Sequence, residues 1–204
     1  MSTSTTFKFT FVLSTLLVSS IASSALIVTS SSSTFATAVA LQGGSVLNES
    51  FDGYNGFYAS GLTGGSGDLA WTATALGGLY ADASTSSMST NNPEVALTMT
   101  FSSPNVFAIG GNFYNTDVNF NTVPGLVVVT VGAVSYFYES NGGSSAFAGF
   151  ISTSGAINSI TFQPFDLGVQ VFATASNVVV GVVPSPAVLA LGALAGAFGR
   201  RRRN

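Results

Sequence analysis

The sequence lacks cysteine and histidine entirely over its 204 residues. Their absence excludes disulfide bonds, thiolate nucleophiles, Ser-His-Asp triads and the commonest zinc sites. A domain of about 140 residues buries a sufficient core without disulfide bonds, which matter mainly for much smaller scaffolds. The chain therefore has to fold by ordinary packing, and most familiar catalytic chemistry is closed to it.

Charge is also scarce, because only 6% of the residues are charged, whereas about a quarter is usual for a globular protein. The five basic residues are Lys8 and the run from Arg200 to Arg203, so the region 41–183 has none. That region contains all eight acidic residues: Glu49, Asp52, Asp68, Asp82, Glu94, Asp117, Glu139 and Asp166. Nucleic acid is excluded as a partner, since phosphate binding needs Lys or Arg. Low charge with abundant Gly, Ser and Thr indicates an exported protein.

The N-terminus has the pattern of a secretory signal. Lys8 precedes a short apolar stretch, residues 9–18, and small residues follow it. Small-x-small cleavage patterns end at Ala25 and at Ala38, and we favour Ala38 because it directly precedes the apparent domain. The sequence thus predicts a signal peptide over residues 1–38. An uncleaved N-terminal membrane helix is the alternative.

Residues 41–183 have the pattern of one all-β domain. Short runs rich in Val, Ile, Phe, Tyr and Thr alternate with clusters of Gly, Asn, Ser and Pro, and helical periodicity is absent from residue 45 onward. The expected strands span residues 94–101, 106–114, 126–131, 135–138, 146–151, 157–162 and 169–182. Strands are also expected between residues 52 and 92, without a defined register. This spacing predicts an antiparallel β-sandwich, most simply a jelly roll.

The C-terminus combines three features in order. Pro184, Ser185 and Pro186 precede an uncharged run, Ala187 to Gly199, and four arginines, Arg200, Arg201, Arg202 and Arg203, follow that run. Thirteen helical residues span only about 20 Å, so a membrane crossing needs residues further upstream or a thinner bilayer. We predict a C-terminal transmembrane helix whose arginines stay on the cytoplasmic side, which places the β domain outside.

This tail, residues 184–204, resembles the PEP-CTERM sorting tail. The resemblance implies recognition and processing by an exosortase-type membrane enzyme, with Pro184 and Pro186 as the motif prolines and the arginines as the basic stop. Ser185 departs from the glutamate of the motif's name. A plain membrane anchor is the alternative. The β domain is similar to domains that precede such tails, through the runs at residues 97–104, 107–113, 147–151 and 157–162, and this implies a sandwich like a carbohydrate-binding module or a lectin.

Two candidate binding sites follow from residue chemistry. Trp71, Tyr54, Tyr58 and Tyr80 lie in the loop-rich first half and would form an aromatic platform for a polysaccharide, although burial in the core is the alternative. A calcium site would use the carboxylate oxygens of Glu49, Asp52 and Asp166, and calcium is the only cofactor that the sequence suggests. The alternative is that these three carboxylates are solvated in loops.

Our leading hypothesis is a non-enzymatic protein of the cell surface or extracellular matrix. Its partners would be the secretion machinery, an exosortase-type enzyme and extracellular polysaccharide, and it would be held transiently in the inner membrane before it is released to the envelope surface or matrix. A secreted carbohydrate-binding module is the alternative. A glycan-processing enzyme is the third hypothesis, and it requires two carboxylates about 5 to 10 Å apart across a cleft.

Overall fold

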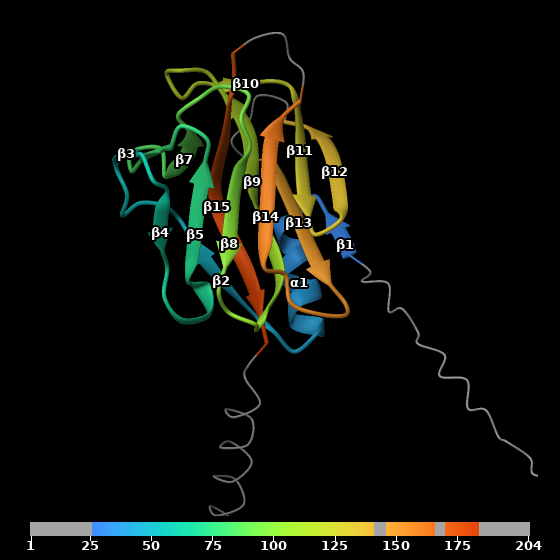
Figure 1. The fold of residues 1–204 in the computed structure, drawn as a ribbon. Helices are drawn as coiled ribbons and strands as arrows, with labels where there is room; N and C mark the ends of the chain where they lie inside the picture. The colour runs from blue at the N-terminus through green and yellow to red at the C-terminus, as the bar shows by residue number, and fades with distance from the viewer. Residues whose placement is uncertain (1–25, 141–145, 166–169, 184–204) are drawn as a thin grey trace, which may run out of the picture.

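The computed structural model describes residues 26–140, 146–165 and 170–183, and these residues form two antiparallel β-sheets with one short α-helix on an outer face (Figure 1). The prediction of an antiparallel all-β domain is confirmed. The larger sheet, sheet A, contains nine strands: β1 (Leu26–Thr29), β13 (Phe147–Ser152), β9 (Val106–Thr116), β15 (Phe172–Val182), β7 (Ser87–Thr90), β6 (Leu79–Asp82) and β3 (Gly56–Tyr58) in spatial order, with β2 (Ser45–Glu49) paired to β15 and β10 (Thr122–Val123) paired to β9.

The smaller sheet, sheet B, contains six strands. In spatial order these are β12 (Val134–Glu139), β11 (Leu126–Val131), β14 (Ser159–Pro164), β8 (Leu97–Phe101), β5 (Trp71–Ala75) and β4 (Leu62–Gly64). A single 3-10 turn, η1 (Gly67–Leu69), precedes β5 within the described residues. The predicted strand at residues 126–131 coincides with β11, whereas β8 starts at Leu97, three residues later than predicted.

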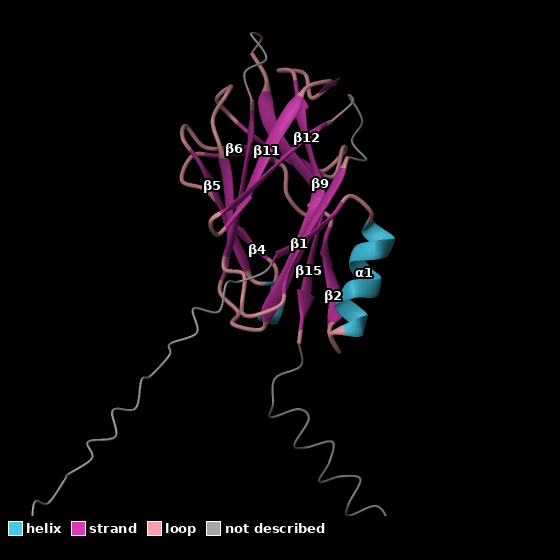
Figure 2. Ribbon diagram, turned by 90° about the vertical axis from the view of Figure 1, so that its right-hand side faces the viewer, coloured by secondary structure: helices cyan, strands magenta, loops and turns pink. Residues whose placement is uncertain are grey.

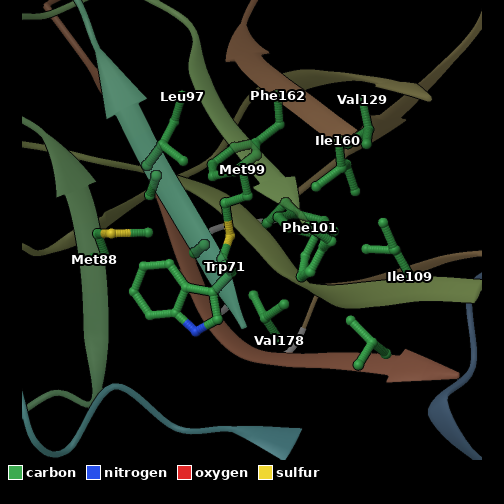
Figure 3. Close-up of a cluster of buried hydrophobic side chains, with 14 of the residues drawn as sticks. Trp71, Met88, Leu97, Met99, Phe101, Ile109, Val129, Ile160, Phe162 and Val178 are labelled. Atoms are coloured by element: carbon green, nitrogen blue, oxygen red, sulfur yellow. The ribbon is translucent and has the colours of Figure 1, made fainter. Parts of the chain in front are cut away.

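The two sheets share one hydrophobic core. In strand β8 alternate residues are buried, with Leu97 and Met99 fully inaccessible and Thr98 and Thr100 on the outer face. This is the two-residue repeat expected of a strand with one face on the core. Side chains from sheet A, such as Ile109 and Phe113, meet them from the opposite layer, and Figure 3 shows part of this cluster.

Helix α1 (Ser32–Leu41) packs on the outer face of sheet A, beside β15 and β2 (Figure 2). The Ser31 hydroxyl caps its N-terminus by accepting from the Thr34 amide. Phe35 and Val39, one turn apart, are its buried residues, at 1% and 0% exposure. Glycines make room for them: a Cβ on Gly149 would lie 2.6 Å from Phe35 Cδ2, and one on Gly181 would lie 2.7 Å from Val39 Cγ2.

The folded unit therefore includes residues 26–38, which fall within the predicted signal peptide. Strand β1 forms four residue pairs with β13, and α1 covers the adjoining sheet surface. The described fold thus includes β1 and α1, which begin before the predicted boundary at residue 41, and a cut after Ala38 would remove β1 and the buried Phe35. Cleavage ending at Ala25, the other candidate, leaves these contacts intact.

The predicted signal core and the whole C-terminal tail lie outside the described residues. This holds for residues 9–18, for Pro184, Ser185 and Pro186, for the predicted helix Ala187 to Gly199, and for Arg200, Arg201, Arg202 and Arg203. In the part of the chain that is described, no helix has the length and hydropathy needed to span a membrane.

Candidate functional site

The predicted aromatic platform is not assembled, because Trp71 belongs to the core. Its side chain is only 3% exposed, and its indole N–H donates to Glu49 Oε2 at 2.8 Å. Phe51 and Tyr54 pack against the indole edge-on, each with ring centroids 5.6 Å away. Trp71 as a glycan contact is therefore corrected to a core residue, and its indole N–H is paired with the half-buried Glu49, as buried Trp N–H groups usually find a partner.

The three tyrosines of that prediction also separate. Tyr54 is half-buried beside Trp71, and burial, followed by the nearby Glu49 carboxylate, raises the pKa of its hydroxyl. Tyr58 packs against the core, and its hydroxyl donates to the Asn55 carbonyl and accepts from the Asn55 amide, both at 3.3 Å. Only Tyr80 is exposed, at 40%, on the outer face of sheet A. One of the four predicted contacts thus remains available to a ligand.

Two acids of the calcium prediction, Glu49 and Asp52, accept hydrogen bonds from protein donors. Glu49 Oε1 accepts from the Phe51 amide at 2.9 Å while Oε2 accepts from Trp71. The Asp52 carboxylate accepts from the hydroxyls of Ser86 and Ser50, which lower its pKa in that order. Asp166 lies outside the described residues, and within the described part no three His, Cys, Asp or Glu side chains gather as a metal site would require. Calcium binding stays a prediction.

A groove on the outer face of sheet A is the strongest candidate site. It has a volume of about 570 Å³ and combines aromatic rings with amide, hydroxyl and carboxylate groups. Its lining residues are Asn55, Tyr80, Asp82, Ser89, Thr90, Asn91, Asp117, Val118, Asn119, Phe120 and Phe172, and we call it the Tyr80–Phe120 groove. A ligand site of this size, with a few converging polar groups, is typical for small molecules and sugars.

The loop between β9 and β10 carries Phe120 to the groove. Asp117 organises this loop, since its Oδ1 accepts from the amides of Asn119 and Asn121 at 2.8 and 2.9 Å, and its Oδ2 accepts from the Asn121 side chain at 2.9 Å. Phe120 has φ +62°, an unfavourable backbone conformation for a bulky residue. Its ring lies 5.6 Å from that of Tyr80, centroid to centroid. Strain of this kind concentrates at binding sites.

Hydroxyl groups on three neighbouring strands form a hydrogen-bonded row that begins at Ser89 in the groove. Tyr80 is the cross-strand partner of Ser89, and Ser89 is the partner of Thr174 on β15. The Thr174 hydroxyl donates to Ser89 Oγ at 3.0 Å and lies 2.7 Å from the Thr116 hydroxyl on β9. These three hydroxyl residues are buried. The exposed Tyr80 ring is thus anchored beside a fixed polar network.

Two carboxylates, Asp82 and Asp117, line this groove. Hydrogen bonds from Ser84, first from its hydroxyl, hold the pKa of Asp82 below its ordinary value, and the Asn121 side chain does the same for Asp117. Both groups are consequently ionised at neutral pH. A glycosidase acid needs a raised pKa, so this pair suits the acceptance of hydrogen bonds and does not suit proton donation.

Sequence reasoning missed most of this groove. A local signal existed for one part of it, because Asp117 is followed by Asn119 and Asn121, a pattern typical of side chains that bond to the backbone two residues on. Nothing local indicated that Asn55, Asp82 and Phe172, from three separate segments, would meet that loop. Strand pairing across the sheet brings them together.

Comparisons with protein-family models, with curated proteins and with solved structures find no match for this chain. The groove and the sequence patterns therefore carry the functional argument.

Proposed function

We propose that this chain is a non-enzymatic exported protein of the cell surface or extracellular matrix, and that its β domain binds a neutral polysaccharide in the Tyr80–Phe120 groove. The observation that supports binding most directly is the exposed Tyr80 ring beside Phe120, in a groove that also holds amides and ionised carboxylates. Sugars offer apolar C–H faces to aromatic rings and hydroxyl donors to carboxylates. The fold that we propose is a jelly roll of the carbohydrate-binding kind.

The charge of the domain favours a neutral ligand. Residues 41–183 contain eight acids and no basic residue, and two of the acids, Asp82 and Asp117, line the groove. An anionic polysaccharide would be repelled at short range without a cation to compensate it. Hydrogen bonds from sugar hydroxyls to carboxylates are charge-assisted and stronger than neutral ones. Uncharged glycans are therefore the ligand class that the groove suits.

The binding experiment compares two exposed aromatic residues. Titration of the protein with neutral glycans (hydroxyethylcellulose, dextran, galactomannan) and with anionic alginate is expected to show saturable binding to a neutral one. Tyr80→Ala should weaken it at least about tenfold, since an aromatic anchor contributes 1.4 kcal/mol or more. Phe57→Ala is the comparison variant, because Phe57 is 53% exposed and lies directly opposite Tyr80 on β3 but does not line the groove, so a ligand held in the groove should lose less affinity from its removal. Equal losses in both variants would refute the groove as the binding site.

A second assay separates binding from catalysis. Asp82 and Asp117 are the two carboxylates that a glycan-processing enzyme would use in this groove. We expect no release of reducing ends from any glycan that binds. If the wild-type protein releases reducing ends, and both Asp82→Asn and Asp117→Asn abolish that activity, the non-enzymatic proposal is wrong.

Export and sorting are proposed from the sequence patterns at the two termini. We expect signal cleavage after Ala25, because β1 and α1 pack into the domain, and removal of the tail near Pro184 by an exosortase-type enzyme. Intact mass of the protein from the envelope and medium of a host that encodes such an enzyme measures both cuts. The control is a Pro184→Ala, Pro186→Ala variant, which should keep its tail. A full-length tail in the wild-type protein would instead indicate a permanent anchor.

A further inference from the structure

Strand β12 is an open edge of sheet B (Figure 1). All six of its residues pair with β11 on one side, and no strand of the described residues pairs with its other side. An edge strand presents backbone N–H and C=O groups on which another strand can pair. The other terminal strands are shorter, with three residues in β4 and β3 and four in β1. β12 is the longest open edge in the described structure.

Protection against pairing is nearly absent from β12. Its sequence, Val-Ser-Tyr-Phe-Tyr-Glu, contains no Lys, Arg, Pro or Gly, the residues that commonly guard an edge. The one charge, Glu139, stands at the end of the strand. By contrast β4 is only Leu-Thr-Gly, with Gly61 and Gly65 at its two ends in positive-φ conformations. The sequence of β12 favours association and that of β4 does not.

The inner face of β12 is firmly packed, so the edge is preformed. The Tyr138 hydroxyl donates to the Phe113 carbonyl on the opposite sheet, and burial raises the pKa of that hydroxyl. The Tyr136 ring meets Phe150 edge-on, with centroids 6.2 Å apart. A partner strand would consequently find a backbone that needs no further ordering, which favours binding.

The outer face next to this edge is apolar. Phe137 and Phe165 are 51% and 46% exposed, and their rings pack edge-on with centroids 5.7 Å apart. The Phe165 amide donates to the Leu126 carbonyl at 3.0 Å, which holds Phe165 beside β11. Exposed apolar clusters on a soluble domain mark interaction surfaces. The cluster adjoins the open edge, so one partner can cover both.

We propose that β12 pairs antiparallel with β12 of a second copy of this chain, so that the two copies of sheet B become one continuous sheet across a two-fold axis at Phe137. The strand matches itself in this register, since an axis at Phe137 pairs residues 135–139 of the two copies and sets Tyr136 opposite Tyr138 on the inner face. In this register Phe137 lies opposite its own symmetry mate and Ser135 lies opposite Glu139, on one face, which keeps the two Glu139 carboxylates apart. A two-fold contact of this kind closes on itself and gives a dimer.

The dimer leaves the glycan groove open. The Tyr80–Phe120 groove lies on sheet A, whereas the pairing uses the edge of sheet B. Two grooves in one particle would raise the avidity for a polysaccharide that can reach both. The dimer itself does not depend on glycan binding, so the two proposals can fail separately.

The absence of cysteine allows a direct test on the full chain, purified from an exporting host. Phe137→Cys introduces the only thiol, and in the proposed register two such thiols face each other across the axis at a separation that a disulfide can bridge. We expect a disulfide-linked dimer under mild oxidation. Thr100→Cys is the control: Thr100 is exposed on the same face of sheet B but lies on β8, away from the edge, and we expect it to form no disulfide-linked species although it still dimerises through β12.

A charge substitution supplies the second readout. Phe137→Lys would place two like charges across the axis, so light scattering after size exclusion should show loss of the dimer, while Phe57→Lys on sheet A should keep it. Tyr80→Ala should also keep the dimer. A wild-type monomer would overturn the proposal. So would equal cross-linking at positions 137 and 100, because that result would mean that another part of the chain, such as the apolar tail, drives association.

Discussion

Substitution of Phe35 tests whether α1 belongs to the stable fold or only rests on it. Phe35 is 1% exposed, and its ring lies 5.8 Å from that of Phe147, centroid to centroid. A buried Phe removes about 150–250 Å² from water, an upper limit of about 4–6 kcal/mol at 25 cal/mol per Å². Ala keeps part of that area. We therefore expect Phe35→Ala to lower the free energy of unfolding by about 3–4 kcal/mol, which is in the range seen for such truncations.

Urea unfolding measured by tryptophan fluorescence gives this quantity, because Trp71 is the only Trp and is buried in the main core. Thr37→Ala is the control on the exposed side of the same helix, and it should change the stability by no more than about 0.5 kcal/mol. A domain of this size is stable by only about 5–15 kcal/mol, so the expected loss is easily resolved. A loss below about 1 kcal/mol for Phe35→Ala would refute the integration of α1 and restore the later signal-cleavage site.

A double-mutant cycle with Gly149 sharpens the same argument. Alone, Gly149→Ala should destabilise the protein by about 1–3 kcal/mol, since the new methyl group would overlap the Phe35 ring. In the Phe35→Ala background the closest contact is gone, and the same substitution should have a smaller effect, which is not zero because Phe147 Cε1 also lies 2.9 Å from the new methyl position. Additive effects would mean that Phe35 does not lie over Gly149, because only residues in contact show such coupling.

Two further outcomes follow from the hydrogen bonds. Trp71→Phe should lower the free energy of unfolding by about 2 kcal/mol, because Glu49 loses a donor to its carboxylate, and should leave glycan binding unchanged, as titration of the variant would show. The pKa of Asp117 in the folded protein lies below its ordinary value of 3.8, first because of the hydrogen bond from the Asn121 side chain. The Asp117 carboxylate therefore stabilises the Phe120 loop fully at pH values above 3.8, and this stabilisation is lost as the pH falls through the lower pKa of the folded state. Glycan binding should therefore stay constant from about pH 8 to 5 and weaken below about pH 4, and Asn121→Ala should raise that midpoint. A midpoint near neutral pH in the binding titration would contradict this assignment.

Local patterns were sufficient to predict most strands of the second half. The β-branched run at residues 126–131 is flanked by turn residues, with Pro124 and Gly125 before it and Gly132 after it. It forms β11 with the same bounds. The Thr and apolar alternation at residues 97–101 likewise decided which face of β8 is buried, because a two-residue repeat leaves little freedom of register. The absence of cysteine likewise excluded disulfides from the sequence alone.

Residues 26–41 show where local reasoning stops. Small and apolar residues between Leu26 and Leu41 match a signal peptide as well as they match a strand followed by a helix. Only the tertiary structure distinguishes these readings, because the fit of Phe35 and Val39 over Gly149 and Gly181 depends on residues more than 100 positions away in the chain.

The proposed glycan site also combines features that the sequence predicts with features that only the fold decides. The sequence by itself determined the chemistry that any ligand meets: no thiol, no imidazole, no cation in the β domain, and aromatic residues spread through it. It did not determine which aromatic residues are exposed, since a Trp or Tyr in a strand suits the core and the surface equally. Packing decided that Trp71 is buried on Glu49 and that Tyr80 faces outward beside Phe120. The physical reason is that exposure depends on which sheet face a residue shares with distant strands, and this is fixed only when the two sheets close on their common core.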